Sequence, residues 1–97
     1  MKVEFLDPAR RELIEAIAYY NNESEGLGYR FAAAVRRTIS RITQHPHAWT
    51  PLSERTRRCR TNGFPYGIIY QIREDTILVV AVMHLHRDPE YWKSRLL

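Results

Sequence analysis

Titratable side chains gather where a long apolar run ends. The run Ile77–Met83 holds seven apolar residues, and His84, His86 and Arg87 follow it closely. An imidazole with a pKa near ~6.5 can take up or release a proton at neutral pH, and a guanidinium can stabilise charge that develops on a phosphate. This combination is suited to cleaving RNA through the 2′-hydroxyl.

Each of these residues also has a structural interpretation. The histidines could be hydrogen-bonded residues at a strand end, and Arg87 could form a salt bridge with Asp88 or Glu90. His84 and His86 are two residues apart and would face the same way on a strand, but metal sites need three or four converging ligands. We therefore predict neither a metal ion nor another cofactor.

A second cluster is rich in arginine. Four of the six residues from Arg55 to Arg60 are arginines. In a strand, Arg58 and Arg60 share one face while Arg57 and Cys59 share the other, so an inward Cys59 would leave Arg58 and Arg60 projecting outward together. Such a cluster can bind phosphates, or it can keep an exposed edge strand from pairing with another chain.

Two aromatic residues, Tyr91 and Trp92, lie close to the C-terminus. They could stack on nucleic-acid bases, but such a pair more often pins a terminal segment to the core. We expect the second role.

The strands that must position these residues follow from the hydrophobic pattern. Tyr66, Ile68, Tyr70 and Ile72 alternate with Gly67, Ile69 and Gln71. Arg73–Thr76 is then a polar break, and Ile77–Met83 is apolar throughout. Alternation indicates a half-buried strand, and a short unbroken apolar run indicates a strand covered on both faces. The sequence predicts a β-hairpin whose second strand is central, and a further strand near Val3–Leu6 that joins the sheet edge. His47–Glu54 predicts an irregular connection.

Two helices are predicted before this hairpin. Asp7-Pro8 is a typical helix start with Asp7 as N-cap, and Ser24 is a candidate cap for a second helix. The second helix carries an apolar stripe over Leu27–Ile42 and should end near His45, before a proline. Asp88-Pro89 repeats the first start signal and predicts a short C-terminal helix. The element order β-α-α-β-β-β predicts an α+β fold, with a helical hairpin packed on a twisted, mainly antiparallel sheet.

Length and composition limit the remaining possibilities. The 97 residues are sufficient for one domain, residues 1–97, with one modest core. The net charge of +4 permits a nucleic-acid or an acidic protein partner. Cys59 is the only cysteine, so no intramolecular disulfide can form, and we expect a cytoplasmic protein without a membrane segment.

Taken together, these motifs resemble one known group of proteins. The residues that carry the resemblance are Asp7-Pro8-Ala9, the Pro46 break, Arg57–Arg60, Phe64–Ile72 and His84–Trp92. In this combination the chain resembles the RelE/ParE superfamily of bacterial type II toxin–antitoxin toxins, on its ParE-like, plasmid-stabilisation side. The resemblance implies a compact fold like that of a small microbial RNase, and a cognate antitoxin. It implies contact with DNA only indirectly, through that antitoxin.

The superfamily has two kinds of target. RelE-like members cut mRNA on the ribosome, whereas ParE-like members bind DNA gyrase. Arg58, Arg60 and Arg87 match basic positions of the RNA-cleaving members, and Tyr91 loosely matches a C-terminal tyrosine. Gly67 stands where those members carry a further arginine. The resemblance therefore favours a toxin that acts by binding, with gyrase as the expected target.

Two alternatives remain open: a ribosome-dependent mRNA endoribonuclease, which would make the chain an enzyme, and a non-toxic relic that only binds its antitoxin. Arg58, Arg60, Arg87 and His84 would be catalytic in the endoribonuclease. The Arg55–Arg60 cluster could also cradle acidic antitoxin residues. The residues expected to bind a target or antitoxin are Arg55, Arg57, Arg58, Arg60, His86, Arg87 and Tyr91.

Overall fold

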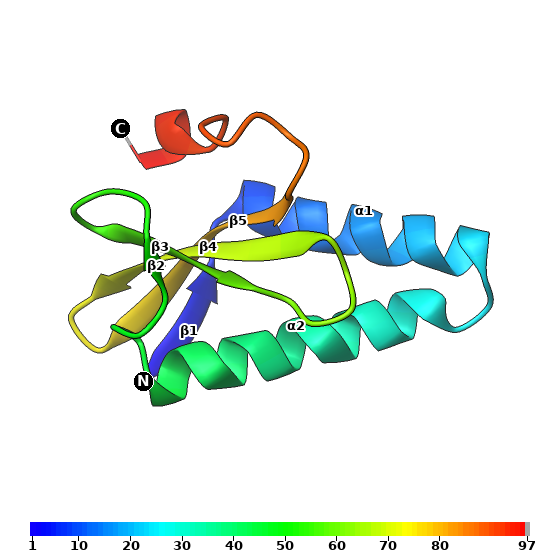
Figure 1. Cartoon of the computed structure of the whole chain (residues 1–97), viewed down its shortest axis with the longest axis horizontal. Coiled ribbons are helices and arrows are strands. Elements are labelled where there is room, and N and C mark those ends of the chain that lie inside the picture. Colours follow the sequence, from blue (N-terminus) through cyan, green and yellow to red (C-terminus); the bar gives the residue numbers. More distant parts are fainter. Residues whose placement is uncertain (97) are drawn as a thin grey trace.

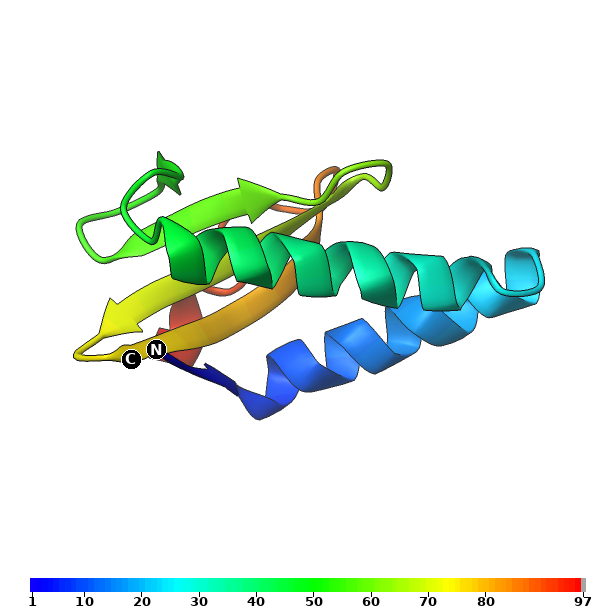
Figure 2. The same cartoon turned by 90° about the horizontal axis from the view of Figure 1, so that it is seen from below.

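Five strands form one mixed sheet in the computed structural model, which describes residues 1–96 (Figure 1). The strand order is β1-β5-β4-β3-β2, and a helical hairpin covers one face of the sheet (Figure 2). The elements are β1 (Lys2–Phe5), α1 (Asp7–Glu23), α2 (Leu27–Gln44), β2 (Thr50–Pro51), β3 (Thr56–Arg60), β4 (Tyr66–Arg73), β5 (Thr76–His84) and the 3₁₀ helix η1 (Lys93–Leu96). The predicted α+β class is confirmed, and the two-residue strand β2 is an addition within the segment predicted to be irregular.

The central hairpin joins β4 to β5 through the two residues Glu74 and Asp75. Glu74 has a φ of 56°, in the left-handed region that tight turns use. All residues of Ile77–Met83 are buried, which confirms the prediction of a strand covered on both faces. β1 lies parallel to β5 at the sheet edge, so the strand predicted near the N-terminus joins the sheet as expected.

A β-bulge at Val80 changes which residues of β5 face the helices. The pairing of β5 with β4 shifts between Val79 and Ala81, which leaves Val80 without a partner on β4. Because side chains alternate along a strand, one inserted residue reverses the alternation beyond it. Val79 and Val82 pack on the helix side, whereas Val80 and Ala81 pack on the other. The bulge therefore turns the end of β5, including His84, toward α1.

The helix starts differ slightly from the predicted ones. Leu6 is the N-cap of α1, and Asp7 lies inside the first turn, where its charge favours the helix dipole. The N-cap of α2 is Gly26 rather than Ser24, because the chain enters this helix through a left-handed φ of 81° that glycine adopts without strain. His45 is the C-cap of α2, as predicted. No helix within residues 1–96 is long and apolar enough to cross a membrane.

The two helices approach each other closely at Gly28. This residue is buried, and its N–H donates a hydrogen bond to Asn21 Oδ1 (2.8 Å). A Cβ atom at position 28 would overlap the backbone carbonyl oxygen of Ile17 on α1. The helical hairpin is therefore joined through backbone contact at one end.

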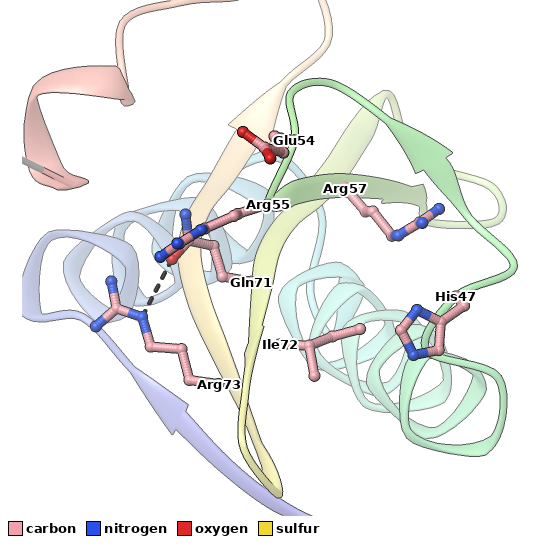
Figure 3. Close-up of a pocket in the computed structure, with 7 residues that line it drawn as sticks. All are labelled: His47, Glu54, Arg55, Arg57, Gln71, Ile72 and Arg73. Atoms are coloured by element: carbon pink, nitrogen blue, oxygen red, sulfur yellow. Dashed lines mark hydrogen bonds between the residues drawn. The ribbon is translucent and has the colours of Figure 1, made fainter.

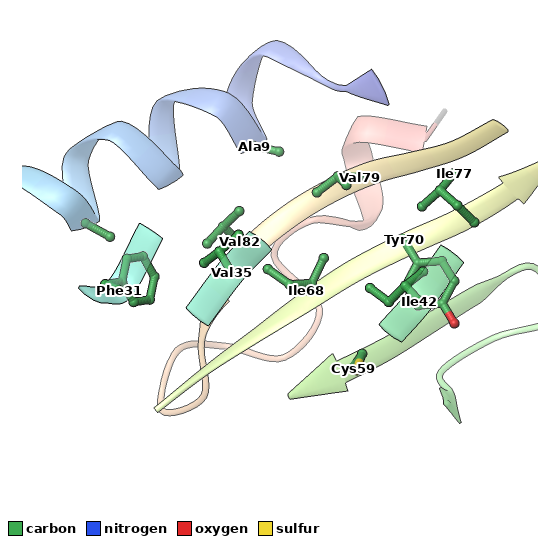
Figure 4. Close-up of a cluster of buried hydrophobic side chains, with 11 residues drawn as sticks. Ala9, Phe31, Val35, Ile42, Cys59, Ile68, Tyr70, Ile77, Val79 and Val82 are labelled. Carbon is green, nitrogen blue, oxygen red and sulfur yellow. The ribbon is translucent and has the colours of Figure 1, made fainter. Parts of the chain in front are cut away.

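The main core lies between the helical hairpin and the sheet (Figure 4). Tyr70, on β4, is fully buried there and donates a hydrogen bond to the carbonyl oxygen of Pro46 (2.6 Å). Burial of each large apolar side chain contributes roughly 1.5–3 kcal/mol. The labelled core residues are Ala9, Phe31, Val35, Ile42, Cys59, Ile68, Tyr70, Ile77, Val79 and Val82.

The C-terminal segment, residues 85–96, covers the opposite face of the sheet (Figures 1 and 2). Trp92 is 2% exposed and packs in a second cluster with Ile69, Val80 and Met83, so it pins the segment as expected. The predicted helix from Asp88 is wrong: the chain makes turns there, and only η1 is helical. The contacts of Tyr91 and Trp92 with distant parts of the chain outweigh the local helix signal.

Candidate functional site

Glu12, on α1, joins three parts of the molecule through one carboxylate. Its Oε1 accepts hydrogen bonds from the Val82 backbone N–H (3.1 Å) and from Arg95 Nη1 (2.8 Å). Its Oε2 accepts from Tyr91 Oη (2.6 Å), Arg95 Nη2 (3.0 Å) and Arg87 Nη1 (3.3 Å). Only 13% of the Glu12 side chain is exposed. The helical hairpin, the end of β5 and the C-terminal segment therefore meet at this carboxylate.

Tyr91 lies between two guanidinium groups. The Cζ atoms of Arg87 and Arg95 are 3.6 and 4.9 Å from the centroid of its ring. Burial, together with the hydrogen bond to Glu12, raises the pKa of Tyr91 well above its usual range. The hydrogen bonds with Glu12 also raise the pKa of Arg95. At neutral pH the cluster is therefore a neutral phenol held between two cations and one carboxylate.

Arg87 does not form the salt bridge with Asp88 or Glu90 that the sequence left open as its structural interpretation. Glu90 pairs instead with Lys93 Nζ (2.9 Å), and Asp88 Oδ1 accepts a hydrogen bond from the Glu90 N–H (3.0 Å). The chain turns back beside α1, so Arg87 reaches Glu12, which lies 75 residues earlier. Just over half of the Arg87 side chain (53%) remains exposed.

The two histidines do not share one strand as predicted, although their ring centroids are 5.2 Å apart. β5 ends at His84, and His86 is in the following turn. The His86 N–H donates a hydrogen bond to His84 Nδ1 (3.1 Å), and the ring of His84 packs edge-on against Tyr66, with centroids 5.1 Å apart. Within residues 1–96 no group of three or more His, Cys, Asp or Glu side chains is placed to hold a metal ion.

A small pocket of about 190 Å³ brings His84 and Arg87 together. Glu12 and Glu15 also line it, from α1, and Tyr66 lines it from β4. Two carboxylates beside one guanidinium make this pocket unfavourable for a phosphate, because like charges repel strongly where water is partly excluded.

Arg58 and Arg60 project together from β3, as predicted, on the face that the C-terminal segment covers. Gly67 leaves room for the Arg58 side chain: a Cβ at position 67 would lie 3.0 Å from Arg58 Cγ and Cδ and 3.4 Å from a methyl group of Leu85. Arg58 is half-buried and its Nε has no hydrogen-bond partner, whereas Arg60 is exposed. Gly67 thus accommodates the Arg58 side chain.

The sheet separates residues that would be catalytic in an mRNA endoribonuclease. His84 faces the helices, whereas Arg58 and Arg60 lie on the opposite face. Cys59 points into the helix-side core, and burial raises the pKa of its thiol, so it is not poised as a nucleophile. Arg58 and Arg60 therefore lie on the other face of the sheet from His84, which lines the same pocket as Arg87.

A pocket of about 450 Å³ lies where β3 begins and β4 ends (Figure 3). Arg55 and Arg57 line it together with Arg73, which comes from the end of β4. Arg57 Nη1 donates a hydrogen bond to the carbonyl oxygen of Trp49 (2.8 Å). Arg55 and Arg57 therefore belong to a different site from Arg58 and Arg60.

Sequence reasoning missed Glu12, Arg95 and Arg73. The hydrogen bonds of Glu12 with Arg95 span 83 residues, so no local spacing could indicate them. In the sequence, Glu12 resembles any acidic residue near a helix start. Arg73 belongs to the polar break of the hairpin, and only the register of β3 on β4 brings it near Arg55.

Comparisons with known proteins agree with this architecture. A family model described as "ParE toxin of type II toxin-antitoxin system, parDE" matches residues 3–89. None of the curated proteins matches the chain. The chain is similar to the solved structure "Chromosomal ParDE TA system from P. aeruginosa", with a TM-score of 0.76 and 9% identity, over 89% of this chain and 97% of that chain. At this identity the similarity concerns the fold. The residues that the family model matches include Glu12 and Arg87 but end before Tyr91 and Arg95.

Proposed function

This chain belongs to the ParE toxin family of type II toxin–antitoxin systems, and we propose that it inhibits growth by binding DNA gyrase rather than by cleaving mRNA. The proposed partner that neutralises it is a cognate antitoxin, and the proposed place of action is the cytoplasm. DNA contact, in this proposal, comes through the antitoxin.

The environment of Arg87 carries the proposal. A ribonuclease would need this guanidinium free to stabilise charge on the reacting phosphate. Here it is 3.3 Å from a Glu12 carboxylate oxygen and stacked 3.6 Å above the Tyr91 ring. A phosphate would have to displace a carboxylate that Arg95 and Tyr91 hold in place. These contacts favour a structural role for Arg87.

The separation of the basic residues supports the same conclusion. General acid–base catalysis needs the proton donor or acceptor within hydrogen-bond reach of the reacting group. His84 lies across the sheet from Arg58 and Arg60, which argues against a shared action of the three on one phosphate. Binding to a large target needs no such convergence, since surface arginines contribute wherever they are exposed.

A paired assay on the purified chain tests the target. One reaction follows supercoiling of plasmid DNA by gyrase, and the other follows mRNA integrity on programmed ribosomes. We expect blocked supercoiling or trapped cleaved DNA, with mRNA intact. Arg87→Ala and the exposed control Arg10→Gln are measured in both reactions. Cleavage of mRNA that Arg87→Ala abolishes and Arg10→Gln retains would contradict the proposal.

A further inference from the structure

The pocket between β3 and β4 carries positive charge that the chain does not neutralise. Three arginines line it, Arg55, Arg57 and Arg73, with Glu54 as the single carboxylate. Of the thirteen arginines in the sequence, only Arg87 and Arg95 form ion pairs within the described part of the chain. The pocket arginines therefore keep their full charge for a ligand.

Neutral groups hold two of these arginines in place. Arg57 donates to the Trp49 carbonyl oxygen (2.8 Å), and Arg73 Nε donates to Gln71 Oε1 (3.1 Å). Gln71 is itself buried and donates to Thr56 Oγ1 (3.2 Å). Each guanidinium is thus oriented without loss of its charge, which lowers the entropic cost of binding an anion.

The pocket also lies beside a free stretch of strand. β3 begins at Thr56, which pairs with Gln71, so Ile72 and Arg73 have partners on β5 but none on β3. An extended peptide could lie along this part of β4 and use its backbone groups. Figure 3 shows Arg55, Gln71 and Arg73 on one side of β4, and His47, Arg57 and Ile72 on the other.

We propose that this pocket binds an extended acidic segment of a protein partner. Successive side chains of such a segment point to opposite sides, so neighbouring carboxylates would meet Arg55 and Arg73 on one side of β4 and Arg57 on the other. Arginine binds carboxylates through two parallel hydrogen bonds. The inference rests on the proposed function only in taking the partner to be the antitoxin.

The lining of the pocket favours a peptide over a nucleic acid. Single-stranded nucleic acids bind on aromatic side chains that stack with their bases. The residues that line this pocket are His47, Glu54, Arg55, Arg57, Gln71, Ile72 and Arg73, and none is Phe, Tyr or Trp. Ile72 instead offers a half-buried apolar contact beside the charges, which suits an aliphatic side chain.

Fluorescence anisotropy with a labelled decapeptide rich in Glu, Val and Thr tests the proposal on the whole chain. The same peptide with Gln for Glu is the uncharged control. We expect Arg57→Gln and Arg73→Gln each to weaken binding at least about tenfold, because each loses a charge-assisted hydrogen bond. Arg36→Gln, an exposed arginine on α2 outside the pocket, should change it less than about twofold. Melting temperatures check that all variants fold.

Three results would overturn the proposal: equal binding of the Glu and Gln peptides, equal effects of Arg73→Gln and Arg36→Gln, or tighter, Arg73-dependent binding of an oligothymidylate with the same charge. The supercoiling assay separates this proposal from the proposed target. If the chain binds the acidic peptide and leaves gyrase active, the proposal for the pocket stands and the proposal of gyrase as the target fails. If the chain inhibits gyrase and does not bind the peptide, the proposal of gyrase as the target stands and the proposal for the pocket fails.

Discussion

At the scale of single residues, Glu12 has the largest set of contacts for one side chain in the site. A mostly buried carboxylate is costly unless it is paired and hydrogen-bonded. Glu12 meets that condition with five hydrogen bonds, two of them from Arg95. It also satisfies the N–H of Val82 on β5, just beyond the point where pairing with β1 stops. One side chain therefore completes the sheet edge and anchors the C-terminus.

Glu12→Gln should lower the free energy of unfolding by about 2–3 kcal/mol. The amide keeps the shape, but it leaves Arg95 without its carboxylate in a partly buried place. Urea unfolding followed by circular dichroism measures the change. The control is Glu15→Gln, an exposed carboxylate on the same helix, which should cost less than about 0.5 kcal/mol. Equal losses in the two variants would show that the Glu12 contacts contribute nothing specific.

At the scale of elements, the helical hairpin depends on how closely α1 and α2 approach. Gly28 permits this approach because it has no Cβ, and its N–H is held by Asn21. Glycine inside a helix normally costs up to ~1 kcal/mol relative to alanine. Its presence in the first turns of α2 is therefore explained by packing rather than by helix propensity.

Gly28→Ala should destabilise the protein by about 2 kcal/mol or more, although the same change stabilises an ordinary helix. The new methyl group would meet the Ile17 backbone carbonyl, which cannot move without shifting α1. Thermal unfolding measures the effect. Adding Asn21→Ala should not restore stability, since the backbone clash remains. An unchanged or raised melting temperature in Gly28→Ala would contradict this account of the hairpin.

Elements with strong local patterns could be predicted from the sequence. The apolar run Ile77–Met83 and the stripe of α2 are each long enough to determine their element type. The C-terminal segment could not be predicted, because Asp88-Pro89 is a local start signal while Tyr91 and Trp92 bind distant residues. The site shows the same limit: the arginines were visible as a cluster, but strand register separates Arg58 from the pocket. Glu12, the partner of Arg87, lies 75 residues away in the sequence, so no local pattern could predict this contact.

At the scale of the whole molecule, several weakly acidic groups on both faces of the sheet are buried or half-buried and have raised pKa values. Burial raises the pKa of Tyr70 to about 12, and the pKa values of Tyr20, Tyr66, Tyr91 and Cys59 are also raised, in each case mainly by burial. Each group is neutral in the folded chain at a pH where it would ionise in the unfolded chain. Their stabilising effect is therefore complete below the unfolded pKa values and is lost as the pH rises toward the folded ones.

Tyr70→Phe tests this alkaline sensitivity. A rise from 10 to about 12 corresponds to about 2–3 kcal/mol of stability lost between those pH values. The variant should be about 1 kcal/mol less stable at neutral pH, since it lacks the hydrogen bond to Pro46, but it should lose less stability above pH ~10. Urea unfolding from neutral pH to pH ~12 measures both effects. Tyr29→Phe, on an exposed ring, is the control and should follow the wild-type curve. Identical alkaline losses in Tyr70→Phe and the wild type would contradict the prediction.

The parallel pairing of β1 with β5 has a consequence for the order of events on the ribosome. β1 can pair only after β5, which begins at Thr76, has been synthesised. Glu12 on α1 can form its hydrogen bonds with Arg95 only after residue 95 has been synthesised. Contacts of such long sequence separation form late in folding. A nascent chain can therefore complete its sheet only after β5 has been synthesised.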